Sequence, residues 1–362
     1  MVFESSPDAE GRFTPEQVRL CLAMIAHAGA HGEPARNAEA LQRELAGWLA
    51  KTEPVREHAI VWGPASFRTC WQPSAAALVV FVVREPADEG YCVVIRGGSP
   101  VSPAGQQLDG FACLEQEPWV WMHDNSDGIA PAICGSVDRA LRVIRQLTPE
   151  ESLPGAGRSL DEFLAERVRE READRRVPIH VTGHGLGGTL ASVVALWLLD
   201  TQGHVPMRES AWDPHRHAKL HCTAFAGPSA GNPDFAGYIA DRLGPELTLI
   251  HNRLDHAPAL WDTQTLLELP ELYRPHVQDI ALIRAMVEAL AGEIERSGIE
   301  YEQPIAVELE GELALDLPPS FMAQATYQHL HAYPALLGLE GLLDVDAILD
   351  RPSGTDGGPV AQ

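Results

Sequence analysis

Positive charge is scarce in this chain. Its 27 Lys and Arg residues face 51 Asp and Glu residues, so the formal net charge is −24 over 362 residues. A surface that acidic repels phosphate backbones and anionic lipid headgroups, which argues against nucleic acid as a partner. We therefore expect any substrate to be neutral or cationic rather than polyanionic.

Long apolar runs and paired cysteines are also missing. No stretch reaches the ~18 apolar residues of a membrane span. The N-terminus has no basic start followed by an apolar run, so we expect no secretory signal peptide. The six cysteines include no C-x-x-C pair, which favours reduced thiols over a disulfide framework. These features favour a cytoplasmic location, while export by a route that needs no signal peptide stays open.

What the sequence does contain is an alternation of strand and helix patterns. The spacing of apolar residues predicts two N-terminal helices, over 14–30 and 34–51, and then a hairpin of strands at 76–84 and 91–97. From residue 136 onward helices and strands alternate: helices at about 136–147 and 160–175, a strand at 178–183, a helix at 185–200, a strand at 220–227, a helix at 233–243 and a strand at 247–252.

This alternation predicts an α/β fold with a mostly parallel central sheet covered by helices on both faces. We expect residues 1–56 to form an N-terminal helical segment packed on the main domain, which spans 57–349. The last stretch, 350–362, has no apolar periodicity and is expected to be a disordered tail.

A glycine-rich turn follows the strand at 178–183. Residues Gly183–Gly187 read GHGLG and match the G-x-S-x-G frame of a nucleophile elbow, except that Gly185 stands at the serine position. In such an elbow a strand ends, turns sharply and leads into a helix. Taken alone, the motif supports equally well a tight turn without chemistry.

The surroundings of this turn resemble the class 3 lipase family, the fungal-lipase-like branch of α/β-hydrolases. The matching segments follow the family's order: IRGG (95–98), the elbow, FAGPSAGN (225–232), LIHNRLDHAPALW (249–261) and YQHLHAYPALLGL (327–339). The resemblance implies an α/β-hydrolase fold and carboxylic-ester hydrolysis on a neutral, lipid-like acyl ester. It implies no metal or organic cofactor. The oligomeric state is left open.

The same resemblance suggests roles for individual residues. It places Asp255 at the acid position, where a carboxylate holds the general-base histidine in one tautomer; a helix cap is the competing interpretation of Asp255. His329 is the expected base, with His331 as the alternative on the same segment. The backbone N–H groups of Gly98 and Leu186 are the implied oxyanion-hole donors.

Residues 99–122 lie where the family often places a mobile lid. Phe111, Leu114, Trp119 and Trp121 are candidates for an apolar face over the substrate cleft. Packing in the core is the competing interpretation, because tryptophans usually bury for packing alone.

A glycine at the elbow keeps the turn but removes the attacking oxygen, and loss of a triad nucleophile costs on the order of a million-fold in turnover. Three explanations stay open. The chain is an inactivated version of an active lipase or esterase, a natural pseudo-hydrolase that binds acyl ligands or a protein partner, or a protein whose His–Asp pair works with a water or substrate nucleophile.

Overall fold

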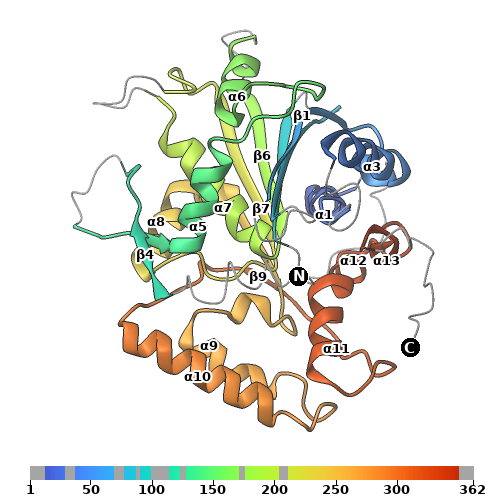
Figure 1. The fold of residues 1–362 in the computed structure, drawn as a ribbon, viewed down its shortest axis with the longest axis vertical. Helices are drawn as coiled ribbons and strands as arrows, with labels where there is room; N and C mark the ends of the chain where they lie inside the picture. The colour runs from blue at the N-terminus through green and yellow to red at the C-terminus, as the bar shows by residue number, and fades with distance from the viewer. Residues whose placement is uncertain are drawn as a thin grey trace, which may run out of the picture.

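The computed structural model describes residues 13–28, 37–68, 77–86, 90–98, 114–122, 128–170, 176–203 and 211–349. A seven-stranded sheet runs through the molecule in the order β1-β2-β3-β6-β7-β8-β9 (Figure 1). Strand β2 (Leu78–Arg84) pairs antiparallel with β1 (Ala59–Phe67) on one side and with β3 (Tyr91–Gly97) on the other. From β3 onward the pairing is parallel, through β6 (Val177–His184), β7 (Ala218–Phe225), β8 (Leu247–Asn252) and β9 (Val307–Leu309).

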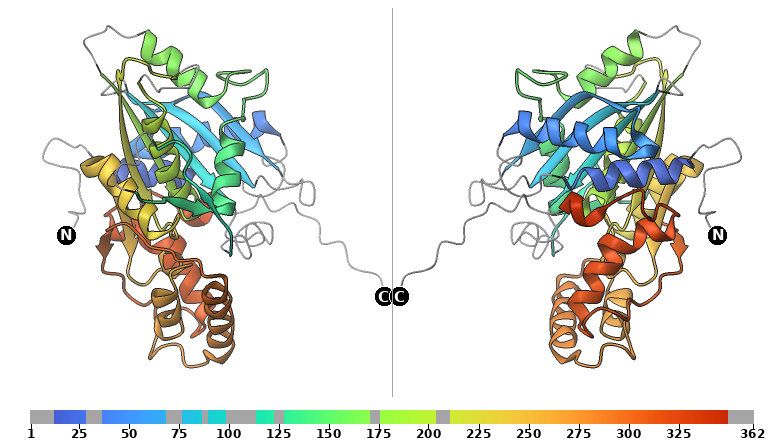
Figure 2. Two further views of the ribbon diagram at one scale, coloured as in Figure 1. Left: turned by 90° about the vertical axis from the view of Figure 1, so that its left-hand side faces the viewer. Right: turned by 90° about the vertical axis from the view of Figure 1, so that its right-hand side faces the viewer.

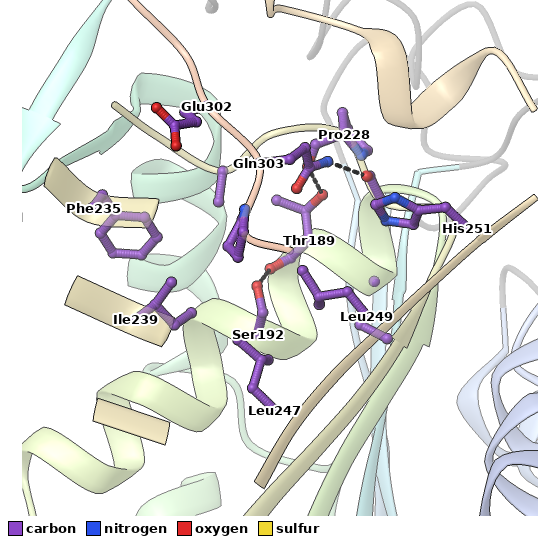
Figure 3. Close-up of a pocket in the computed structure, with 15 residues that line it drawn as sticks. Thr189, Ser192, Pro228, Phe235, Ile239, Leu247, Leu249, His251, Glu302 and Gln303 are labelled. Atoms are coloured by element: carbon purple, nitrogen blue, oxygen red, sulfur yellow. Dashed lines mark hydrogen bonds between the residues drawn. The ribbon is translucent and has the colours of Figure 1, made fainter. Parts of the chain in front are cut away.

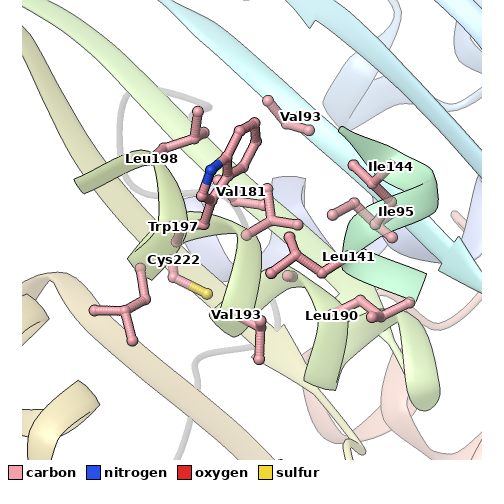
Figure 4. Close-up of a cluster of buried hydrophobic side chains, with 14 of the residues drawn as sticks. Val93, Ile95, Leu141, Ile144, Val181, Leu190, Val193, Trp197, Leu198 and Cys222 are labelled. Atoms are coloured by element: carbon pink, nitrogen blue, oxygen red, sulfur yellow. The ribbon is translucent and has the colours of Figure 1, made fainter. Parts of the chain in front are cut away.

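Four helices cover one face of this sheet: α5 (Gly135–Ile144), α6 (Leu160–Arg169), α7 (Leu186–Asp200) and α8 (Pro233–Leu243). Helix α7 is apolar on nearly every side, as expected of a helix enclosed by other elements. Figure 4 shows Leu190, Val193 and Trp197 of α7 beside the strand side chains Ile95 and Val181. A separate two-stranded ribbon, β4 (Gln116–Pro118) with β5 (Ala132–Cys134), precedes α5.

Helices from both ends of the chain cover the other face. They are α1 (Pro15–Ile25), α3 (Ala38–Lys51), α12 (Ala332–Leu336) and α13 (Val345–Leu349). Thr14 caps α1 in a capping box with Gln17, whose side-chain amide also donates to the carbonyl of Leu337 at 2.9 Å. The first and last helices therefore share one hydrophobic core on this face.

The remaining helices gather at one end of the molecule: α9 (Thr263–Glu268), α10 (Ala281–Ser297) and α11 (Phe321–Thr326), as Figures 1 and 2 show. The short helical turns η1 (Glu53–Val55), η3 (Gly244–Glu246), η4 (Ala257–Ala259), η5 (Leu269–Glu271) and η6 (Tyr327–His331) link these elements. Among the described helices, none is long and apolar enough to cross a membrane.

The strands and helices expected from the sequence between residues 76 and 252 are present with small shifts at their ends. The final part of the helix expected over 160–175 and the tail expected at 350–362 lie outside the described residues. Strand β1 was not expected. Gly63 and Pro64 interrupt its pattern, and its pairing with β2 shifts register on either side of Trp62.

Candidate functional site

The turn between β6 and α7 has the backbone geometry that an elbow requires. Gly185 adopts φ 60° and ψ −132°, a conformation that side-chain-bearing residues rarely adopt. Its N–H donates to the carbonyl of Phe225 on the neighbouring strand β7 at 2.9 Å. A Cβ atom at Gly183 would lie 2.2 Å from the carbonyl oxygen of Gly187, so strand and helix can approach this closely only with glycine there.

His329 stands directly over this turn. Its Nδ1 lies 2.9 Å from Asp255 Oδ2 and 3.0 Å from Oδ1. On the other side of the ring, Nε2 lies 3.1 Å from the point that a Cβ atom of residue 185 would occupy. His331 points elsewhere, with its Nδ1 3.6 Å from Asp346. The structure therefore brings His329, and not His331, together with Asp255 and Gly185.

Local structure fixes the two partners. Asp255 follows the end of β8, and His329 lies in the π-helical turn η6 between α11 and α12. The hydroxyl of Tyr333 donates to Asp255 Oδ2 at 2.9 Å and accepts from the N–H of Asn252 at 3.0 Å. The side-chain amide of Asn252 donates to Oε1 of Gln328, the residue before His329, at 2.8 Å. Strand β8 is thus joined by hydrogen bonds to turn η6 through Gln328 and to helix α12 through Tyr333.

Asp255 is buried but carries a negative charge. Burial alone would raise the pKa of its carboxyl group, but the electrostatic attraction to the His329 imidazole and the hydrogen bond with it outweigh burial and hold that pKa well below the usual range. The N–H of Ala257 adds a third donor at 3.0 Å. A carboxylate held this way fixes the tautomer of His329, because Nδ1 must carry the proton and Nε2 is left as the acceptor.

Three further imidazoles lie behind and beside His329. The ring of His184 is 4.6 Å from that of His329, His256 is 5.6 Å from it, and His27, just after the end of α1, packs 5.6 Å from His184. Burial lowers the pKa of His184 to about 3, that of His256 to about 4 and that of His27 well below its ordinary value. All three are neutral near pH 7, so they add no positive charge beside His329.

Sequence reasoning missed these imidazoles and the part played by Tyr333. His184 carries a usable signal, because it directly precedes Gly185 in the elbow. Nothing in the sequence around His27 points to a site more than 150 residues away.

The two expected oxyanion donors have different surroundings. Leu186 is the first residue of α7, where helices leave backbone N–H groups unpaired, and no acceptor takes its N–H in the part of the chain that the structure describes. The N–H of Gly98 donates to the carbonyl of Ala77 at 2.7 Å, because the ladder between β2 and β3 extends by one bond. The structure therefore contradicts the role expected of Gly98.

The lid expected over 99–122 is wrong for its two tryptophans. Trp119 and Trp121 lie in the core, and Trp119 Nε1 donates to Asp200 Oδ2 at 2.9 Å. The Trp119 ring is buried against α7 and its N–H has a partner, as tryptophans in a core require. Neither tryptophan therefore faces a cleft. Leu114 is partly buried between this core and the cluster that joins α9 to α10. Phe111 lies outside the described residues.

A small, partly open cavity lies beside the elbow without including it. It measures about 20 Å³, room for one or two water molecules. Figure 3 shows it between α7 and α8, lined by Ser192, Phe235, Leu249 and His251. Gln303 donates to the carbonyl of Gly227 at 2.7 Å and closes one side. Gly185, Asp255 and His329 do not line it.

The chain is similar over nearly its whole length to a crystal structure of M37 lipase. The sequence identity is 29%, the TM-score is 0.82, and the similarity covers 94% of this chain and 96% of that chain. Residues 151–264 match the family described as Lipase (class 3). The scaffold is lipase-like. The predicted fold class, an α/β-hydrolase arrangement with a mostly parallel sheet, is thereby confirmed.

More distant fungal lipases share less of this scaffold. Lipase II from Rhizopus niveus has 15% identity and a TM-score of 0.43, over 70% of this chain and 77% of that chain. A nonglycosylated Yarrowia lipolytica lipase has 14% identity and a TM-score of 0.44, over 67% and 72%. A search of curated proteins gives no match. The segment matched by the family includes Gly185 and Asp255 and ends before His329.

Proposed function

We propose that this lipase scaffold carries an ester-hydrolysis site of the Ser-His-Asp type in which Gly185 occupies the nucleophile position. Asp255 orients His329, and His329 is the general base. The single observation that supports this most strongly is the placement of His329, whose Nδ1 is held by Asp255 while Nε2 faces the elbow. The substrate class that fits a lipase scaffold of net charge −24 is a neutral, lipid-like acyl ester.

The glycine at position 185 limits hydrolysis by the covalent route. An acyl-enzyme needs an oxygen on residue 185, and glycine supplies none. Because removal of a triad nucleophile costs on the order of a million-fold in turnover, the chain is nearly inactive by the covalent route. One oxyanion donor, the N–H of Leu186, sits next to the elbow as required. Gly98 is not assigned as the second, since its N–H is already bonded to Ala77.

The test is Gly185→Ser, assayed with a short-chain p-nitrophenyl ester beside the unaltered chain. Hydrolysis is expected to rise by several orders of magnitude, because serine restores the nucleophile beneath His329. The new Cβ lies 3.1 Å from Nε2, so the imidazole must shift by a few tenths of an ångström. Serine at a positive φ costs about 1 kcal/mol in the free energy of unfolding.

Gly185→Ala is the matched control, since it adds the same Cβ and the same backbone strain without an oxygen. A gain in Gly185→Ser that is absent from Gly185→Ala identifies the hydroxyl as the cause. A folded Gly185→Ser protein that hydrolyses no faster than Gly185→Ala would contradict the proposal. The runner-up, an acyl-binding protein without catalysis, would then take its place.

A further inference from the structure

The glycine at the elbow leaves the base of the pair facing open space. Apart from its chain neighbours, the only described atoms within 4 Å of a Cβ at residue 185 are Nε2 and Cε1 of His329. Nδ1 of that ring carries the proton shared with Asp255, so Nε2 has a free lone pair directed at this space. A proton acceptor is therefore in position although the group that would normally give up its proton is missing.

We infer that this chain hydrolyses activated esters directly, with His329 taking a proton from a water molecule that stands in for the serine hydroxyl. The inference rests on the proposed function, since it uses the same base, acid and backbone donor. The water oxygen bonds to the ester carbonyl carbon while its proton passes to Nε2 of His329. The carbonyl oxygen takes the negative charge beside the N–H of Leu186.

The tetrahedral intermediate then collapses. The bond from carbon to the alcohol oxygen breaks, and the leaving oxygen receives the proton from Nε2. The products are the carboxylic acid and the alcohol, the imidazole returns to its neutral form, and no acyl-enzyme forms at any stage. This route needs only water besides the ester.

The surroundings of His329 suit this role. The charged imidazolium that forms during the step lies against the Asp255 carboxylate, whose Oδ2 also accepts from the Tyr333 hydroxyl. His184 and His256, the rings packed on His329, are neutral near pH 7 and do not repel the imidazolium. Tyr333 is also neutral, because burial, more than the nearby Asp255 charge, holds its pKa well above the ordinary value.

The expected rate is modest. A positioned general base contributes about 10²–10⁴-fold, and one oxyanion donor contributes about 10²–10³-fold. The contribution of the serine nucleophile is absent. Hydrolysis of an activated ester such as p-nitrophenyl acetate is therefore expected above the buffer rate but far below that of Gly185→Ser.

The experiment compares initial rates on p-nitrophenyl acetate for the unaltered chain, His329→Gln, His331→Gln and Gly185→Ala. His329→Gln is expected to lose about 100-fold or more of the rate above buffer. His331→Gln is the matched control, because His331 lies in the same turn but faces Asp346. It is expected to stay within twofold of the unaltered chain.

Gly185→Ala tests the water position without touching the base. Its methyl group would stand 3.1 Å from Nε2, in the space through which water must approach. We expect at least a tenfold loss, whereas a site that worked without this water would be unaffected. Gly185→Ala also tests the inference if His329→Gln does not fold.

Two further readouts separate this route from covalent catalysis. The unaltered chain should show no pre-steady-state burst and no labelling by a fluorophosphonate, whereas Gly185→Ser should show both. Equal rates for His329→Gln and His331→Gln, or for Gly185→Ala and the unaltered chain, would overturn the inference. If Gly185→Ser is active in either case, the proposed function stands while the direct route fails. If Gly185→Ser is inactive, the proposed function itself has failed.

Discussion

Acid should destabilise this protein earlier and more steeply than its carboxylates explain, because of the imidazoles buried behind the elbow. His27 and His184 are fully enclosed, and in both cases burial is the main reason that the pKa lies below 6.5. In the folded protein they stay neutral while the unfolded chain takes up protons. Their contribution to stability is therefore complete above about pH 6.5 and is lost as the pH falls towards the folded-state pKa.

The size of the effect follows from these shifts. Each such imidazole lowers the free energy of unfolding by about 1.4 kcal/mol per pH unit below its unfolded-state pKa. Between pH 6.5 and 4.5, His27 and His184 together remove about 5 kcal/mol, since both remain neutral over that range. Native proteins are stable by about 5–15 kcal/mol in total, so this loss brings the protein close to unfolding.

The perturbation is His27→Gln, which removes one titrating group from the buried cluster while keeping a polar side chain. Urea unfolding followed by tryptophan fluorescence at pH 7.5, 6.5, 5.5 and 4.5 gives the free energy at each pH. The slope below pH 6.5 should fall by about 1.4 kcal/mol per pH unit relative to the unaltered chain. His215→Gln, at an exposed histidine, is the control and should leave the slope unchanged.

An unchanged slope in His27→Gln would refute the reasoning, because it would mean that His27 takes up its proton as readily in the folded protein as in the unfolded chain.

Two predictions concern the architecture of the site. Tyr333→Phe removes a donor to Asp255 and leaves the N–H of Asn252 without its acceptor, so urea unfolding should show a loss of about 1–3 kcal/mol; no loss would mean that water replaces the hydroxyl. Gly183→Ala would place a methyl group 2.2 Å from the Gly187 carbonyl and should abolish soluble folded protein, whereas Gly47→Ala, with nothing within 4 Å on helix α3, should gain about 0.5–1 kcal/mol. Equal melting temperatures for these two alanine variants would contradict the close packing at the elbow.

The elbow and Asp255 were accessible from the sequence because each sits at the end of a strand with a plain pattern. The apolar run before Gly183 and the small residues after it define the turn, and Asp255 follows β8 within three residues. The sequence favours His329 over His331 only through the resemblance to the family, and the physical reason for the difference was not accessible. That difference depends on the π-helical turn at 327–331, which rotates successive side chains in a way that helical spacing does not reveal.

Other errors came from long-range contacts. The N–H of Gly98, expected to be an oxyanion donor, instead donates to the carbonyl of Ala77, because of the register between β2 and β3. Trp119 is buried in the core, where its N–H donates to the carboxylate of Asp200, 81 residues away in the sequence. Helix α10 carries a readable apolar spacing in Val287, Ala291 and Ile294, but nothing in it indicates its packing against α9.

The bond between the Gln17 side chain and the Leu337 carbonyl has a consequence for synthesis of the chain. Its two ends are 320 residues apart, so at about 5–20 residues per second the ribosome needs roughly 15–60 s to deliver the second after the first. Three side chains of α1 are buried in the finished protein: Leu20, Leu22 and Met24. Throughout that interval, much of the core that covers them has not yet been synthesised. The nascent chain therefore offers chaperones an apolar helix throughout this interval.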